Sequence, residues 1–243
     1  MTARFFIDGV HARGEEVELR DGDAYKIVRV LRLRSGDVVE LIDSAGFIFP
    51  ACLVIRDARV SALLAEPTAG SVEPALRITL AQGIPKGQKM DYIVEKTTEL
   101  GIARIIPFIS ERVIGEERSA SKLERWRRLA RTAAQQSGRT HIPPVDAALS
   151  WEDLIAAFPA FDVVLLPWEL AERVALRSAL PSILSGAGQA LVIIGPEGGI
   201  SHAEANSALA AGARAVSLGS RILRTETAGV VACATLLYEA GEI

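Results

Sequence analysis

The sequence feature that most constrains the fold is an aliphatic run that ends abruptly in a cluster of glycine and proline. Leu191-Val192-Ile193-Ile194 is followed directly by Gly195-Pro196-Glu197-Gly198-Gly199. A continuous apolar run bounded by turn residues is typical of a strand that is covered on both faces of a sheet. Ser201 and Glu204 then have the spacing of a capping box, in which both side chains bind the first free amides of a helix. The stretch therefore predicts a buried strand, a tight loop and a helix.

A second strand that ends at a glycine is followed by the last helix of the chain. Residues 213–218 predict a strand that ends at Gly219, and the next helix is expected to begin near Thr225. Two strand ends with exposed backbone, close in sequence, predict the two walls of one ligand crevice at the carboxyl edge of a sheet. The last helix carries small residues at 228, 229 and 232–235. Because a glycine inside a helix costs about 1 kcal/mol relative to alanine, this small side indicates close packing against another segment.

The two glycine-containing motifs together carry a resemblance to a known family. GPEGG at 195–199 and LGSRILRTETA at 218–228, in this order and at this distance, resemble the RsmE family of 16S rRNA (uracil-N3)-methyltransferases of the SPOUT class. Further matches, such as Lys86-Gly87-x-Lys89-Met90, extend the similarity over nearly the whole chain. The resemblance implies an α/β fold in which a SPOUT-type trefoil-knot methyltransferase domain is preceded by a small PUA-like β-barrel.

The resemblance also implies a cofactor, a substrate and a partner. The cofactor is S-adenosyl-L-methionine, and the reaction is methylation of N3 of a specific uridine of 16S rRNA in the small ribosomal subunit, the 1498 site. Members of the family dimerise through the knotted domain, so the resemblance implies a homodimer. The small residues on one side of the last helix point to the same prediction. The residues expected to hold the cofactor are Leu166, Gly195, Pro196, Glu197, Gly198, Gly199, Leu218, Gly219, Ile222, Leu223, Arg224, Thr227 and Ala228.

Composition changes character near residue 72, which predicts two domains. Residues 1–72 have the short apolar runs and turn residues of a mostly β domain, with one helix over 21–32. The segment 66–74 has the composition of a linker, and strands alternate with helices from residue 73 to residue 243. The first domain resembles the family's RNA-binding barrel through Val30-Leu31-Arg32 followed by Ser35-Gly36-Asp37, although Tyr25-Lys26 stands where family members often carry histidines.

Basic residues cluster in two segments although the net charge is −3. The segment 24–34 holds Lys26, Arg29, Arg32 and Arg34 and no acidic residue, and the segment 118–139 holds seven basic residues against Glu124 alone. Such a segment is either a solvated helix face or a phosphate-binding surface, and two of them in one acidic chain favour RNA. Trp126 lies among these arginines and is expected to be core. The candidate RNA-binding residues are Arg4, Arg29, Arg32, Arg34, Arg125, Arg128 and Arg139.

Several other classes of protein are disfavoured. No apolar run approaches the roughly 18 residues of a membrane span or forms a signal peptide, so a cytoplasmic location without membrane attachment is expected. Cys52 and Cys233 are far apart and have no zinc-binding spacing, so no metal is expected. Three dispersed histidines and no nucleophile elbow argue against covalent catalysis. GPEGG also lacks the spacing of a P-loop or dinucleotide motif.

The chemistry of uracil N3 predicts which residues act in the reaction. Its proton must leave as the methyl group arrives, so the site needs a proton acceptor or a cation that stabilises the developing anion. Arg224 and Glu226 lie where the second motif meets the last helix, which makes them the charged residues nearest to the expected donor. They are the candidate catalytic pair, with Glu197 as the rival base. The structural alternative is that Glu226 caps its own helix and pairs with Arg224. Two alternatives for the whole chain are a SPOUT enzyme for another rRNA or tRNA nucleotide and a non-catalytic RNA-binding assembly factor.

Overall fold

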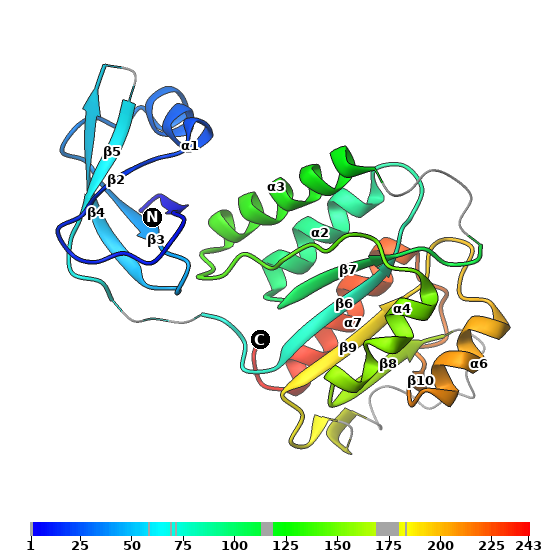
Figure 1. Cartoon of the computed structure of the whole chain (residues 1–243). Coiled ribbons are helices and arrows are strands. Elements are labelled where there is room, and N and C mark those ends of the chain that lie inside the picture. The colour runs from blue at the N-terminus through cyan, green and yellow to red at the C-terminus, as the bar shows by residue number, and fades with distance from the viewer. Residues whose placement is uncertain are drawn as a thin grey trace. The chain divides into compact units, whose positions relative to one another are not determined.

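The computed structural model describes residues 2–57, 59–68, 70, 72–112, 119–168, 180–182 and 184–243. The chain divides into two compact units, which Figure 1 shows with the order of their elements. The first unit is Met1–Glu73 with Ala134–His141, and the second is Pro74–Ala133 with Ile142–Ile243. The contiguous domains expected from sequence, 1–72 and 73–243, therefore differ from these units in the placement of residues 134–141.

The first unit is built on a five-stranded sheet with the order β1-β3-β4-β5-β2. Its strands are β1 (Arg4–Phe6), β2 (Glu16–Glu18), β3 (Val38–Ile42), β4 (Ile48–Arg56) and β5 (Arg59–Leu64). β1 and β3 are parallel, and the remaining pairs are antiparallel. Alternate residues such as Phe5, Leu41, Phe49 and Leu53 fill the core of this unit, as the strand period of two requires.

The helix expected over 21–32 is shorter and irregular. Helix α1 (Asp21–Tyr25) continues as one π-helical turn, Lys26–Val30. The chain then leaves the helix, and Arg32 has a positive φ of 56°. The basic residues 29, 32 and 34 therefore lie at a helix end and in the loop after it.

The second unit contains a five-stranded parallel sheet with the order β10-β8-β9-β6-β7. Its strands are β6 (Arg77–Gly83), β7 (Arg104–Phe108), β8 (Val163–Pro167), β9 (Gln189–Ile194) and β10 (Arg214–Val216). Its helices are α2 (Lys89–Leu100), α3 (Ala120–Ser137, whose residues from Ala134 on belong to the first unit), α4 (Trp151–Ala156), the 3-10 turn η2 (Phe158–Ala160), α6 (His202–Ala210) and α7 (Thr225–Glu239).

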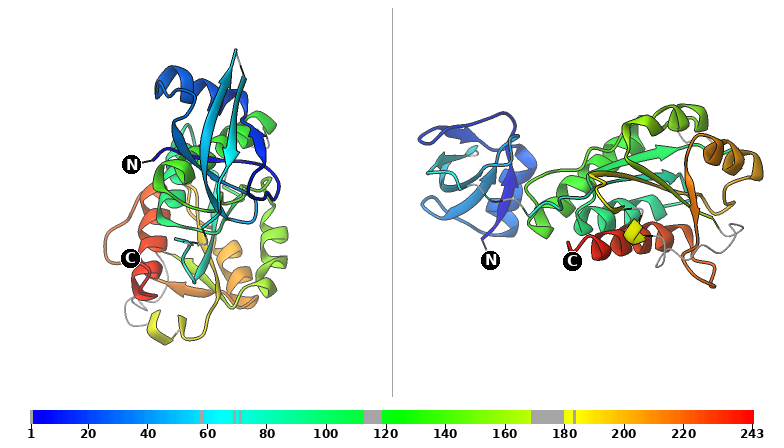
Figure 2. Two further views of the ribbon diagram at one scale, coloured as in Figure 1. Left: turned by 90° about the vertical axis from the view of Figure 1, so that its left-hand side faces the viewer. Right: turned by 90° about the horizontal axis from the view of Figure 1, so that it is seen from below.

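Helices cover both faces of this sheet (Figures 1 and 2). Val192 and Ile194 of β9 pack in a cluster with side chains of α2, α3 and α7, whereas Leu191 and Ile193 pack with α4 and α6. All four side chains are buried, which confirms the prediction of a strand covered on both faces. Trp126 belongs to the first cluster and is 5% exposed, which confirms its interpretation as core.

The loop after β9 ends in the predicted capping box at the start of α6. Ser201 Oγ accepts from the Glu204 amide, and the Glu204 carboxylate accepts from the Ser201 amide at 2.8 Å. In the described part of the chain, no helix combines the length and apolar character needed to cross a membrane.

Candidate active site

A cavity of about 540 Å³ lies at the carboxyl edge of β8, β9 and β10. Its walls are the strand end Pro167-Trp168, the loop 194–200 and the loop 217–225, with Lys89 and Ala228 beside them. Ligand pockets commonly measure about 300–1,000 Å³, so the cavity suits a small molecule or cofactor. The two strand ends predicted from sequence therefore do form two walls of one crevice.

The glycines of the first wall allow close approach of backbone segments. A Cβ added to Gly195 would lie 3.0 Å from Cγ1 of Ile200, and one added to Gly198 would lie 3.1 Å from Cβ of Arg112. Gly83, at the end of β6, is tighter still, because a Cβ there would lie 2.5 Å from Cδ of Pro196. At Gly83, Gly195 and Gly198 the neighbouring segments therefore approach too closely for a larger side chain to fit without a shift.

The second wall is a loop that carries one exposed apolar side chain and two that are half-buried. Gly219 has a φ of 117°, a conformation that residues with a Cβ rarely adopt. Ile222 is 89% exposed and Leu223 is half-buried, and both line the cavity. Apolar side chains left open beside a cavity indicate a ligand-binding surface.

Most residues predicted to hold a cofactor line this cavity, and two do not. Leu166 is fully buried, because strand alternation points its side chain into the core beneath α4 and α6. Thr227 is an exposed residue in the first turn of α7 and is not part of the lining. At the end of β8 the lining is made by Pro167 and Trp168.

Glu197, the rival base, is already engaged. Its carboxylate forms an ion pair with Lys89 Nζ at 2.6 Å and accepts from the Lys86 amide at 3.2 Å. Burial alone would raise the pKa of Glu197, but the hydrogen bonds from Lys89 and from backbone amides hold this pKa below its ordinary value. A carboxylate stabilised in this way is a poor proton acceptor.

The candidate catalytic pair is placed differently. Arg224 is exposed and lines the cavity, and α7 begins after it without a side-chain cap. Oε2 of Glu226 is buried and has no hydrogen-bond partner in the structure. No ion pair joins Arg224 to Glu226 among the described residues, whereas Glu226 is the acidic residue in the first turn of α7, where a negative charge favours the helix dipole. A buried carboxylate oxygen without a partner is uncommon and calls for an explanation.

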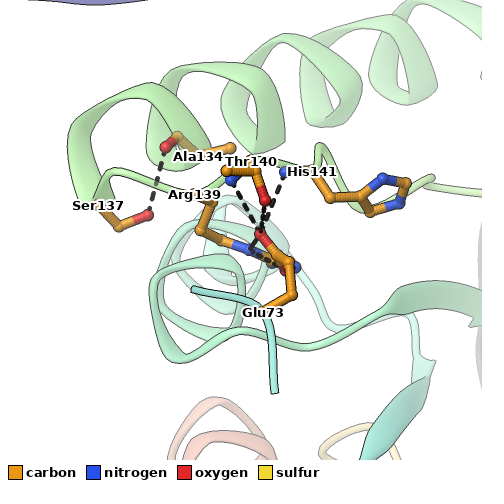
Figure 3. Close-up of polar contacts among 6 residues, drawn as sticks. All are labelled: Glu73, Ala134, Ser137, Arg139, Thr140 and His141. Carbon is orange, nitrogen blue, oxygen red and sulfur yellow. Dashed lines mark hydrogen bonds and ion pairs between the residues drawn. The ribbon is translucent and has the colours of Figure 1, made fainter. Parts of the chain in front are cut away.

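Arg139 was predicted to bind RNA, and the structure places it in a buried ion pair (Figure 3). Helix α3 ends at Ser137, and Gly138 with a φ of 74° turns the chain back in the manner common at helix ends. The guanidinium of Arg139 then pairs with the Glu73 carboxylate, which also accepts from the amides of Thr140 at 2.9 Å and His141 at 3.1 Å. The Arg139 side chain is 4% exposed, so it is not available to a phosphate.

The remaining candidate RNA-binding residues fall into two groups. The side chain of Arg4 contacts Glu40 and the carbonyl oxygen of Gly138, and Arg125 pairs with Asp91 at 2.5 Å. The others are exposed and form no ion pair within the part of the chain that the structure describes: Arg29, Arg32, Arg34 and Arg128. Arg118, which was counted in the basic segment, lies outside the described residues.

Comparison with known proteins assigns a class to this fold and site. Residues 72–237 match the model of the RNA methyltransferase domain. The Ribosomal RNA small subunit methyltransferase E of Bacillus subtilis is 32% identical, with 97% of this chain and 96% of that protein covered. The enzyme of the same name from Neisseria gonorrhoeae, solved bound to S-adenosyl methionine, has a TM-score of 0.88 at 32% identity, with 98% of each chain covered.

A putative methyltransferase from Legionella pneumophila, solved in complex with the cofactor SAM, gives a TM-score of 0.86 at 30% identity and covers 98% of both chains. The chain is therefore an RNA methyltransferase by class. It belongs to the family of the ribosomal RNA small subunit methyltransferase E, as the resemblance of its two motifs indicated.

Proposed function

We propose that this protein transfers the methyl group of S-adenosyl-L-methionine to N3 of a specific uridine of 16S rRNA, the 1498 site. Membership of the methyltransferase E family supports the reaction, and the two similar structures were solved with this donor bound. The observation that carries the proposal is the cavity at 194–200 and 217–225, which is formed by the two motifs that define the resemblance.

The residues of the cavity fit such a donor. Backbone groups of 195–199 and 217–219 offer hydrogen bonds to a polar ligand, and Leu218, Ile222, Leu223 and Ala228 offer apolar contacts to a flat ring system. The bound donor would supply a methyl carbon that is already electrophilic. The chain therefore has to bind, align and exclude water, and alignment alone can contribute about 7–11 kcal/mol to the barrier reduction.

Glu226 is proposed to accept the N3 proton of the uracil, and Arg224 to stabilise the negative charge that develops on the base. Oε2 of Glu226 is buried without a hydrogen-bond partner, one residue after Thr225 of the cavity lining, whereas the Glu197 carboxylate is paired with Lys89 and a backbone amide. Glu226 would accept the N3 proton, and the exposed guanidinium of Arg224 at the cavity would stabilise the developing negative charge. Since N3 lies on the Watson–Crick edge, the base must be unpaired or extruded when it reacts.

RNA binding is proposed to depend on exposed cations of both units. The side chains suited to phosphates are those of Arg29, Arg32 and Arg34 in the first unit and Arg125 and Arg128 in the second. If five phosphates are neutralised, the logarithm of affinity should fall with the logarithm of salt concentration with a slope near −4 to −5 for duplex-like contacts. Arg4 and Arg139 are left out because their side chains are only 26% and 4% exposed in contacts within the protein, whereas the side chain of Arg125 is 49% exposed although it pairs with Asp91.

Three further features are proposed from the family resemblance. These are a trefoil knot in the second unit, closure of the first sheet into a PUA-like barrel, and a homodimer, with the cytoplasm as the place where the ribosomal subunit is met. Gly229 and Ala232, on the small side of α7, are buried against the sheet of the same chain, so the proposal of a dimer rests on the family resemblance. Light scattering at micromolar concentration tests the dimer, because a fully active monomer would contradict it.

Methyl incorporation separates this function from its alternatives. Small ribosomal subunits from cells that lack the protein should accept labelled methyl groups from the donor when the purified protein is added. Absence of donor binding and of incorporation would favour a non-catalytic RNA-binding factor. Incorporation at another nucleotide would identify a different SPOUT specificity.

A further inference from the structure

A buried glutamine lies directly behind the cavity without lining it. Gln82 belongs to the carboxyl end of β6, where it is paired with Ile194 of β9, and it is fully buried. Its Nε2 donates to the carbonyl oxygen of Gly83 at 2.9 Å and to Thr225 Oγ1 at 2.9 Å. The carbonyl oxygen of Ile194 lies at 3.5 Å from the same nitrogen. One side chain thus reaches the ends of two strands and the start of α7.

The direction of these hydrogen bonds follows from their partners. The carbonyl oxygens of Gly83 and Ile194 can only accept, so the amide nitrogen of Gln82 must face them. Thr225 Oγ1 then accepts from Gln82 and has its own proton left to donate. That proton goes to the carbonyl oxygen of Gly195, at 2.6 Å. The relay therefore runs from Gln82 through Thr225 to Gly195.

The two ends of the relay belong to the two walls of the cavity. Gly195 begins the turn of the first wall, and Thr225 ends the loop of the second wall and starts α7. Gly229, one turn further along α7, makes room for the amide, since a Cβ there would lie 3.2 Å from Gln82 Oε1. Oε1 itself is buried and has no hydrogen-bond partner in the structure. A buried amide oxygen without a hydrogen bond costs stability, so the position of Gln82 calls for an explanation other than stability.

We propose that Gln82 is a positioning residue for methyl transfer, which holds the two walls in their donor-binding arrangement through the hydroxyl of Thr225. This inference rests on the proposed function, because it takes S-adenosylmethionine as the ligand. Gln82 touches no ligand itself. Its contribution is preorganisation, so that donor binding does not have to order the loops 195–199 and 217–224.

The test compares donor binding and steady-state kinetics in variants that interrupt the relay. Gln82→Met keeps the length of the side chain but cannot donate, and Thr225→Val keeps the shape but lacks the hydroxyl. Each should weaken S-adenosylmethionine binding in calorimetry by about tenfold, and should raise KM for the donor similarly while kcat at saturating donor changes less than about threefold. Thr225→Ser, which retains the hydroxyl, should bind the donor nearly as well as the wild type.

Thr97 provides the matched control for stability. It is fully buried in α2, and its hydroxyl donates to the carbonyl oxygen of Ile93 at 2.7 Å. Thr97→Val should lower the melting temperature about as much as Thr225→Val and leave donor affinity unchanged. The Gln82→Met/Thr225→Val double variant should bind the donor about as weakly as either single variant, because both interrupt one relay.

The possible results distinguish failure of the positioning role from failure of the proposed methyltransferase function. A wild-type protein that binds no S-adenosylmethionine would overturn both. If the wild type binds and Gln82→Met binds within twofold of it, the function stands and the positioning role is refuted. Donor affinity that falls equally in Thr97→Val would also refute it, because loss of stability alone would then explain the effect.

Discussion

Replacement of Arg139 by alanine should destabilise the first unit strongly. The guanidinium is buried against Glu73, whose carboxylate would keep the amides of Thr140 and His141 and the Thr140 hydroxyl among its partners. Removing one partner of a buried ion pair costs about 3–5 kcal/mol. Because Glu73 is still 21% exposed and keeps these backbone donors, we expect the lower end, about 3 kcal/mol. At about 4 °C per kcal/mol for a unit of this size, the melting temperature should fall by about 12 °C.

Thermal unfolding followed by two probes would measure this effect. Far-UV circular dichroism reports on both units, whereas tryptophan fluorescence reports on the second, because Trp126, Trp151 and Trp168 all belong to it. Arg128→Ala is the control, since this exposed arginine forms no ion pair in the described structure and should change stability by less than about 0.5 kcal/mol.

The pH dependence of the same ion pair adds a second readout. Burial alone would raise the pKa of Glu73, but the hydrogen bonds from Arg139 and from backbone amides hold this pKa below its ordinary value. The stabilisation is therefore present above the carboxylate pKa of the unfolded chain, about 4.3, and is lost as pH falls through the lower pKa of the folded protein. Arg139→Ala should flatten this dependence. An Arg139→Ala protein that melts with the wild type and loses RNA affinity as Arg128→Ala does would refute the structural role.

Three other predictions concern the site. Arg128→Ala should reduce the salt slope of RNA binding by about one unit without changing donor affinity, and an unchanged slope would remove Arg128 from the RNA-binding surface. Arg224→Ala and Glu226→Gln should each slow methyl transfer by about 100-fold at saturating donor in a single-turnover assay; normal rates in both variants would mean that water removes the proton. Gly83→Ala should cost about 1–3 kcal/mol in urea unfolding because its Cβ meets Pro196, whereas Gly188→Ala, with its nearest contact at 3.7 Å, should be nearly neutral.

The sequence was sufficient to predict the elements whose side chains follow a period. The run 191–194 had to be buried on both faces, and the glycines after it had to be a turn, because few other structures accommodate that pattern. The crevice followed, since the carboxyl ends of neighbouring parallel strands meet at one edge. Trp126 could be assigned to the core from its helical spacing with apolar neighbours.

The partners of individual side chains could not be predicted from sequence. Arg139 and Arg128 look alike in an arginine-rich segment, and only the turn at Gly138 brings Arg139 to Glu73. Gln82 lies in an apolar strand with no local signal for its role, because Ile194 and Thr225, its partners beyond the adjacent Gly83, are 112 and 143 residues away along the chain. Long-range pairing of this kind depends on how strands and loops assemble.

The most direct test of the proposed function is to map the nucleotide that the protein methylates. Small ribosomal subunits from cells lacking the protein would be incubated with it and with isotopically labelled S-adenosylmethionine, and the 16S rRNA would be digested and sequenced by mass spectrometry. The proposal predicts one labelled fragment containing N3-methyluridine, which should form about 100-fold more slowly when Glu226→Gln replaces the wild type. Label at another atom or another nucleotide, or no label with an intact and donor-bound protein, would contradict it.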